Sequence, residues 1–366
     1  MRLVAESGLW TTGRPTAPWP LAAVLEVSGA VLSWTIDEQA DAIHITFTDV
    51  SRADWLWRVV GQSGYVDLVS ALGAAAPDEP RSIDLTGVDI APGSLAPLRR
   101  LAVGHWLRRW WPASQRDGIA GLDHSLLDVE IATLTAGAQD FFTDDTLDSD
   151  VAELLAPHAA SLMTYLRSDD ERVRKLVRAG VEIADEVGID VESSTALDIP
   201  TGRQDDYALA AGTDGNPLGS ATIARGVASI SWAAVPPGVF DAAEDTVSWS
   251  VEAAGAAVVA VVRAAVVGPD PATGIPVRVR SGDVRGTGAL GSDGHATLPL
   301  VDAAQRPVTE SSAWNHDWPT TSVVIGADLA ESRQTRDRIR SWARARLDRP
   351  PDDAFLAEIL AAESAY

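Results

Sequence analysis

The chain of 366 residues contains no cysteine. This excludes disulfides, iron–sulfur clusters, thiolate zinc sites and a cysteine nucleophile. Lys175 is the only lysine among 29 basic residues, and it lies in the helical pattern Val173–Leu176. A Walker-type phosphate loop, which needs Gly-Lys-[Ser/Thr], is therefore absent. Asn216 and Asn315 are the only asparagines, and this bias resembles the codon usage of a GC-rich bacterial genome.

Long apolar runs are also missing. The longest, residues 253–267, is interrupted by Arg263 and is shorter than the about 20 residues of a membrane-spanning helix. The first residues, Met1–Gly8, contain no apolar core of a secretory signal. The sequence therefore predicts a soluble, cytoplasmic protein.

Acidic residues outnumber basic ones by 52 to 29, which gives a net charge of −23. A chain with this charge repels nucleic acid and anionic membranes as a whole, so we expect neither as a partner. The 13 tryptophans contrast with only 4 tyrosines and 5 phenylalanines. Because tryptophan and arginine anchor many protein interfaces, the composition favours a protein partner or self-association.

The residue pattern predicts an α+β, multidomain chain that starts with a mixed N-terminal part at 1–93. Strands are expected at 21–27 and 30–36 around a Ser28-Gly29 turn, and at 43–47, where apolar and polar residues alternate. Ser51 is expected to cap a short helix.

A helical, acidic middle region is predicted for residues 94–190. Apolar residues recur with helical spacing over 122–142, 151–166 and 169–187. The acids at the start of the last segment favour a helix N-terminus there.

Short β-branched segments separated by Pro, Gly and Asp turns predict an antiparallel β-sandwich over 191–327. The C-terminal tail, 328–366, returns to a helical pattern, with Asp328 as the expected cap of its first helix.

The run Gly274–Leu300 contains a strand, a Gly-Thr segment, a turn at Asp293-Gly294 and a closing apolar strand. It resembles the centre of a transthyretin-like or carboxypeptidase-regulatory-like β-sandwich over about 258–325. The resemblance implies an accessory or interaction module with no catalytic residues to carry over. Independently, period-two alternation predicts that Val277 and Val279 share one inward face.

Residues Gly286–Gly291 match the dinucleotide-binding pattern G-x-G-x-x-G. That motif binds a pyrophosphate only when a strand precedes it and a helix follows it. Here a Ser292-Asp293-Gly294 turn and alternating residues follow, so we expect a β-hairpin. With neither this site nor a metal motif such as H-E-x-x-H, no cofactor and no metal ion are expected.

His124 and Asp128 are four residues apart, so a helix places them on one face. Together with Asp123 or Glu130 they could bind a metal ion or carry out acid–base chemistry. The alternative is a solvated helix start with Asp123 near its cap.

A second His-Asp pair, His316 and Asp317, is bracketed by Trp314 and Trp318. Two aromatic faces could hold a planar or apolar ligand, with His316 or Asp317 as its polar contact. The alternative is a structured loop whose tryptophans seal one end of the sandwich.

Four aspartates, Asp144, Asp145, Asp148 and Asp150, are spaced as oxygen ligands of calcium can be. The loop lacks the central glycine and the closing glutamate of an EF-hand. The acids also precede a helix, whose N-terminus they would stabilise.

The segment 98–111 combines arginines with tryptophans. This pairing can stack bases or grip phosphate, or it can form a helix with a buried tryptophan side and arginines along its rim. The net negative charge favours the second interpretation. The residues concerned are Arg99, Arg100, His105, Trp106, Arg108, Arg109, Trp110 and Trp111.

In the C-terminal tail, Arg336, Arg340 and Arg344 form a stripe at helical spacing, with Trp342 on a different, apolar stripe. Either the arginines are a solvated basic face, or Trp342 anchors the helix while they face an acidic surface. That surface would be the chain's own 121–190 region or a partner subunit.

These observations lead to two hypotheses. The first is a non-enzymatic interaction, assembly or regulatory component of a bacterial multi-protein system, of the conflict or defence type. Its partner-binding residues would be Arg336, Arg340, Arg344, Trp342, Trp314 and Trp318. The second is a hydrolase-like enzyme of an unrecognised family that uses His124, Asp128, His316 or Asp317. No known catalytic signature is present, so the first is favoured and no catalytic residue is assigned.

Overall fold

The computed structural model describes residues 1–39, 41–74, 81–139, 141–142, 148–189, 221–254, 257–329 and 331–364. The chain divides into two compact units, each built from segments that are distant in sequence. Unit 1 comprises Met1–Trp111, Leu122–Leu197 and Ser341–Tyr366; unit 2 comprises Pro112–Gly121 and Asp198–Arg340.

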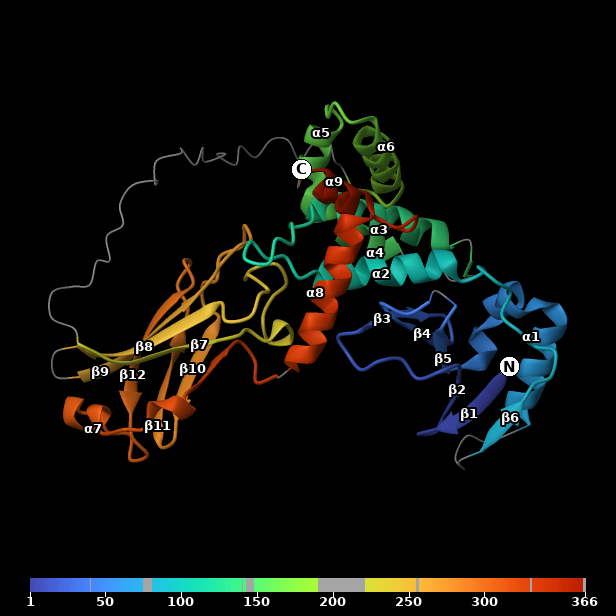
Figure 1. Ribbon diagram of the computed structural model, residues 1–366. Coiled ribbons are helices and arrows are strands. Elements are labelled where there is room, and N and C mark those ends of the chain that lie inside the picture. Colours follow the sequence, from blue (N-terminus) through green and yellow to red (C-terminus); the bar gives the residue numbers. More distant parts are fainter. Residues whose placement is uncertain are drawn as a thin grey trace. The chain divides into compact units, whose positions relative to one another are not determined.

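Unit 1 begins with a six-stranded antiparallel sheet in the order β3-β4-β5-β2-β1-β6 (Figure 1). The predicted hairpin is confirmed, because β3 and β4 pair directly across Ser28-Gly29. Gly29 adopts a φ of +72°, and a Cβ there would lie 2.1 Å from the Asp49 carbonyl oxygen, so only glycine fits. The strands are β1 (Arg2–Glu6), β2 (Leu9–Thr12), β3 (Ala22–Val27), β4 (Ala30–Thr35), β5 (Ile43–Phe47) and β6 (Ser82–Asp84).

The expected cap at Ser51 is wrong. The Asp49 carboxylate accepts a hydrogen bond from the Ser51 N–H at 3.0 Å, so Asp49 caps the short helix η1 (Val50–Arg52). Aspartate outcompetes serine here because it stands two positions earlier, immediately before the helix, where the first unpaired N–H groups are within reach of its side chain.

The other described elements of unit 1 are helices, and α3 packs against α2, α4, α6 and α9. The approach of α6 to α3 depends on Gly180, where a Cβ would lie 2.6 Å from Val129 Cγ1. The helices are η2 (Asp54–Leu56), α1 (Trp57–Gly73), α2 (Ala96–Trp110), α3 (His124–Gln139), α4 (Asp148–Leu155), η3 (Ala156–His158), α5 (Ala159–Tyr165), α6 (Glu171–Glu186) and α9 (Leu356–Ser364).

Unit 2 is built on a seven-stranded antiparallel sheet in the order β13-β10-β11-β12-β9-β8-β7. Its inward-facing residues form one apolar core that includes Val251, Val262, Val277 and Leu298. Its elements are β7 (Thr222–Ala228), η5 (Trp232–Ala234), β8 (Val247–Ala254), β9 (Ala257–Ala264), β10 (Pro276–Ser281), β11 (Val284–Ala289), β12 (His295–Val301), α7 (Glu310–Trp314), η6 (Trp318–Thr320) and β13 (Ser322–Ile325).

The antiparallel character of this region is confirmed, but its strands form one sheet that curves toward a barrel, where a two-sheet sandwich was expected. The pairing of β12 with β9 joins the two groups of strands into one sheet. Val277 and Val279 both lie buried on the inward face, as predicted. Gly286–Gly291 continues along strand β11 into the turn before β12, and this confirms the hairpin and overturns the dinucleotide interpretation.

The short segment 112–121 belongs to unit 2 because buried Asp241 holds it there. One carboxylate oxygen of Asp241 accepts hydrogen bonds from the backbone N–H groups of Gln115 and Arg116 at 3.0 and 3.3 Å. The other oxygen accepts the Ala243 N–H at 2.9 Å. A buried carboxylate is stable in this position because each oxygen has a donor.

Helix α8 (Arg333–Asp348) is the predicted helix of the tail, but Asp328 does not cap it. The Ser332 side chain accepts a hydrogen bond from the Thr335 N–H at 3.0 Å, which is the geometry of an N-cap. In the segments that the structure describes, no helix combines the length and apolar character needed to cross a membrane.

Candidate functional site

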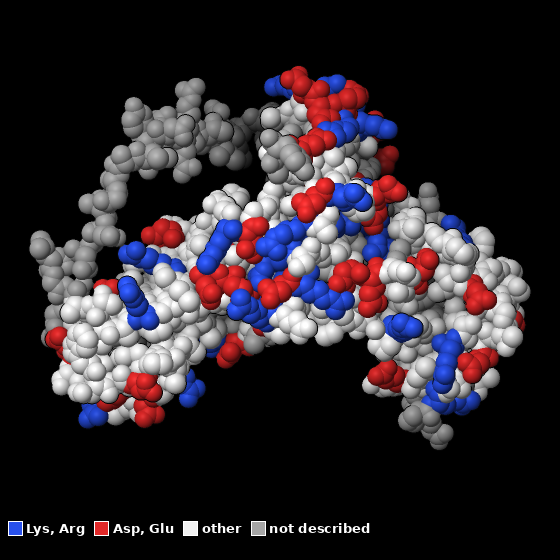
Figure 2. All heavy atoms as spheres, in the orientation of Figure 1, with Lys and Arg blue, Asp and Glu red and all other residues white. Residues whose placement is uncertain are grey.

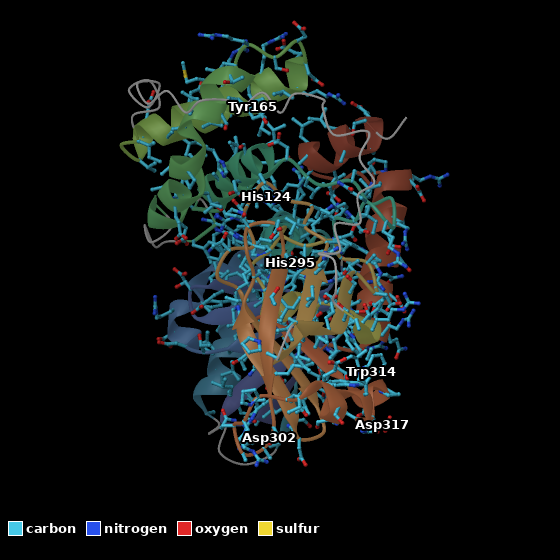
Figure 3. The ribbon with its side chains drawn as sticks, turned by 90° about the vertical axis from the view of Figure 1, so that its left-hand side faces the viewer. His124, Tyr165, His295, Asp302, Trp314 and Asp317 are labelled. Atoms are coloured by element: carbon cyan, nitrogen blue, oxygen red, sulfur yellow. The ribbon has the colours of Figure 1, made fainter. Side chains whose placement is uncertain are left out.

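His124 and Asp128 do not form the predicted pair. His124 is exposed at the first position of α3, whereas Asp128 is only 2% exposed. The partner of Asp128 is His158 in η3, whose Nε2 lies 2.9 Å from Asp128 Oδ2. On the other side of the ring, His158 Nδ1 lies 3.1 Å from Ser125 Oγ. Figure 3 shows His124 and Tyr165 on the helices of unit 1.

The same cluster links α2 to α3. Arg108 Nε lies 3.0 Å from Asp128 Oδ1. Burial, together with the positive charge of Arg108, lowers the pKa of nearby His105. Asp123 caps α3 through the Leu126 N–H at 3.0 Å, as predicted, and accepts a hydrogen bond from the Tyr165 hydroxyl. These contacts hold α2, η3 and α5 against α3.

The second predicted pair also fails to converge. His316 Nε2 lies 3.0 Å from the hydroxyl of buried Ser281, whereas Asp317 is exposed. Trp318 is buried and donates from Nε1 to the Ala313 carbonyl at 2.8 Å, whereas Trp314 is 53% exposed. The two tryptophans therefore do not form a clamp, and Trp318 closes the core as the loop alternative predicted. Figure 3 shows Trp314, the last residue of α7, and Asp317 close after it.

Arg336 and Arg340 are buried, 8% and 3% exposed, so they do not form a solvated face. Both bind Glu244: Arg336 through Nε and Nη2 at 2.8 and 2.9 Å, and Arg340 through Nη2 at 2.9 Å. Burial raises the pKa of Glu244, but hydrogen bonds from the two arginines and Ser229 outweigh it and lower that pKa to about 2.

The acidic partners of these arginines are thus Glu244 and, for Arg340, Asp117 and Asp337. None of them lies in the predicted 121–190 region. The prediction that Arg336 and Arg340 bind a partner is therefore wrong, because carboxylates inside unit 2 already neutralise their charges.

The second half of α8 belongs to unit 1. Trp342 packs on Trp106 of α2 in a T-shaped pair with ring centres 5.1 Å apart, so its anchoring role is intramolecular. Arg344 is half-buried. Arg346, which the sequence did not single out, is buried and binds fully buried Glu358 through Nε and Nη2 at 2.5 and 2.8 Å.

The arginine–tryptophan segment of α2 matches the predicted helix with a buried tryptophan side. Trp106 and Trp110 are buried, and Arg99 and Arg100 bind Asp353 and Glu130. Asp144, Asp145 and the side chain of Asp148 lie outside the described residues, and Asp150 is exposed. No group of three His, Asp or Glu residues in the described part of the chain is arranged to hold a metal ion.

Sequence reasoning missed the surface formed by β7, β8 and β9 in unit 2. Strand pairing aligns two rows across these strands, Val227–Ser248–Arg263 and Arg225–Ser250–Val261. We call these six residues the β7–β9 face.

The β7–β9 face is hollow because Ser248 and Ser250 on its middle strand are small, while larger side chains flank them on both sides. The hollow has a volume of about 870 Å³. The two arginines occupy opposite corners and the two valines the other corners, with the serines along the floor. Val227 is 60% exposed, more than any other large apolar side chain that the structure describes.

Both arginines of this face, Arg225 and Arg263, are exposed and make no ion pair within the described residues. Glu252 also lines the hollow, but its Oε1 accepts a hydrogen bond from Ser250 at 2.7 Å. On the side away from β8, β7 has no neighbouring strand among the described residues. Figure 2 shows that the seven-stranded sheet is mostly uncharged on the side in view, with separate basic and acidic side chains.

No family model, no curated protein and no solved structure matches the chain.

Proposed function

We propose that the protein is an interaction component of a bacterial multi-protein system and that the β7–β9 face binds an acidic segment of its partner. The observation that carries this proposal is the pair of exposed arginines, Arg225 and Arg263, at opposite corners of a hollow and without ion-pair partners in the described residues. In a chain with 52 acidic residues, arginines have many opportunities to pair internally.

Other arginines of this chain illustrate the chemistry. Arg336 and Arg340 bind Glu244 through charge-assisted hydrogen bonds, and Arg346 binds Glu358 in the same way. A carboxylate brought to Arg225 or Arg263 would find the same donors. Bidentate geometry of this kind is stronger than an ordinary neutral hydrogen bond, and arginine is enriched among residues that dominate interface energies.

The net charge of −23 does not prevent this association. At physiological ionic strength the screening length is about 8 Å, so charges far from the hollow act weakly on a bound segment. The local arginines then determine the attraction, and binding weakens as salt is added.

The resemblance of about 258–325 to transthyretin-like modules supports an accessory or interaction role, since it implies no catalytic residues. Strands β9 to β13 fall in this stretch. The cytoplasmic location and the link to conflict or defence systems stay predictions.

The proposal is tested by affinity capture with the full chain and two matched variants. One carries Arg225→Glu and Arg263→Glu; the other carries Arg280→Glu, an exposed arginine on β10 of the same sheet. We expect a partner that binds the native chain and the Arg280 variant but is lost with the double variant. A partner captured equally by all three proteins contradicts the proposed surface.

A hydrolase-like activity is the second candidate, because Ser125, His158 and Asp128 form a chain of hydrogen-bonding side chains. Serine hydrolases use the same three residue types, with the base accepting the serine proton. In those enzymes Nε2 of the histidine contacts the serine, whereas here Nδ1 of His158 contacts Ser125 and Nε2 contacts Asp128. A fluorophosphonate probe decides the case: labelling of the native chain that disappears in Ser125→Ala and His158→Ala supports the activity, and an unlabelled native chain rejects it.

A further inference from the structure

The diagonal placement of Arg225 and Arg263 determines the spacing of the charged groups on the ligand as well as the sign of their charge. We infer that the partner segment is an extended peptide that lies along this diagonal and carries two carboxylates four residues apart. This inference rests on the proposed function and specifies the chemistry of the segment.

The strand register gives the spacing. Arg225 on β7 and Arg263 on β9 are separated by two strand spacings and belong to neighbouring rows of the face. Strands lie about 4.8 Å apart, and neighbouring rows, two residues apart, differ by about 6.8 Å, so the two Cα atoms are about 12 Å apart. An extended peptide advances about 3.4 Å per residue, and its side chains alternate between its two faces. Positions i and i+4 lie on the same face about 13.6 Å apart, so this spacing matches the distance best.

The remaining residues of the face fit the same segment. Val227 and Val261 flank the diagonal on either side and offer apolar contact to the residues between the two carboxylates. Ser248 and Ser250 form a floor of small side chains, which lets a peptide backbone approach the sheet.

The occupant is a peptide and not a nucleic acid for two reasons. Glu252 lines one end of the hollow and repels a run of consecutive phosphates. The two valines suit apolar side chains between the anionic groups, whereas a nucleic acid backbone carries a charge at every step.

The experiment uses the full chain and synthetic ten-residue peptides of threonine and valine that contain two glutamates. The number of residues between the glutamates varies from none to six, and a peptide with one glutamate is the control. Binding is measured by fluorescence anisotropy. We expect the affinity to peak at the spacing i,i+4, to be lower at i,i+3, where the two side chains point to opposite faces, and to fall about tenfold with one glutamate. We also expect Arg225→Glu to lose this preference and to regain affinity when one glutamate is replaced by lysine.

The outcomes separate this inference from the proposed function. Equal affinity at every spacing overturns the two-carboxylate geometry but leaves the acidic segment in place, provided that binding still needs Arg225 and Arg263. Loss of binding on backbone N-methylation, regardless of glutamate spacing, indicates strand addition to β7 and also overturns the geometry. Binding that is insensitive to both arginines, or no binding by any peptide, rejects the inference altogether.

Discussion

Two glutamates of α9 bind arginine through the same bidentate geometry but differ in burial. Glu358 is fully buried, and its two oxygens bind Arg346, while the Phe355 N–H donates to Oε2 at 2.9 Å. Glu363 is exposed and binds Arg172 of α6 with both distances at 2.7 Å. They form a matched pair for testing how much burial matters.

We predict that Glu358→Gln strongly destabilises unit 1. The substitution leaves the Arg346 charge buried, with Asp353 at 3.1 Å as its remaining carboxylate. Breaking a buried ion pair by removing one partner costs about 3–5 kcal/mol, and the remaining Asp353 favours the lower end, about 3 kcal/mol. For a unit of this size that corresponds to a fall in Tm of roughly 6–12 °C.

Thermal unfolding followed by helical circular dichroism measures this effect. Glu363→Gln is the control, and we expect its midpoint to match that of the native chain, because solvent and salt already screen an exposed pair. Equal losses in the two variants would refute the argument from burial. An unchanged midpoint in Glu358→Gln would refute it as well.

Three further predictions concern packing, pH and the α3 cluster. Gly180→Val destabilises unit 1 by about 1–3 kcal/mol because its side chain meets Val129, whereas Gly137→Ala, exposed on α3 with open space around it, stabilises by about 0.5–1 kcal/mol; denaturant midpoints decide both. The depressed pKa of Glu244 contributes stability that is complete above the ordinary pKa of 4.5 and is lost as pH falls toward 2. Between pH 4.5 and 2, the Tm of Glu244→Gln is therefore expected to fall less than the Tm of the native chain. Asp128→Asn weakens the hydrogen bonds of this side chain with His158 and Arg108 by about 1.5–3 kcal/mol. Faster amide hydrogen exchange across α5 than in the native chain checks this, and unchanged exchange contradicts it.

Local sequence patterns predicted local structure where side chains alternate clearly. The β3–β4 hairpin has a two-residue turn that requires glycine, and β5 alternates Ile43, Ile45 and Phe47 with polar residues, so both were predictable. Strand β1 was missed because exposed Val4 and small Ala5 blur its alternation, although Leu3 is fully buried. The single sheet of unit 2 depends on β12 pairing with β9, a long-range contact that strand periodicity does not encode.

The candidate sites were harder because their partners are distant in sequence. His158 lies 30 residues from Asp128, and Glu244 lies 92 residues from Arg336. A helical stripe of arginines therefore looked solvated although its acidic partner sits on another segment. The β7–β9 face could not be predicted from the sequence for a similar reason, since only the register of three strands places Ser250 between Arg225 and Val261. The one available hint was the small serines alternating along β8.

Site-specific photo-crosslinking from the floor of the hollow tests the central claim most directly. A benzophenone amino acid replaces Ser248 in the full chain, expressed in cells of its source organism, and the same group replaces Arg280 in a control. The account predicts that Ser248 crosslinks one partner through an acidic segment, that Arg225→Glu with Arg263→Glu abolishes the product, and that the control gives none. No product at Ser248, or the same product from both positions, would contradict it.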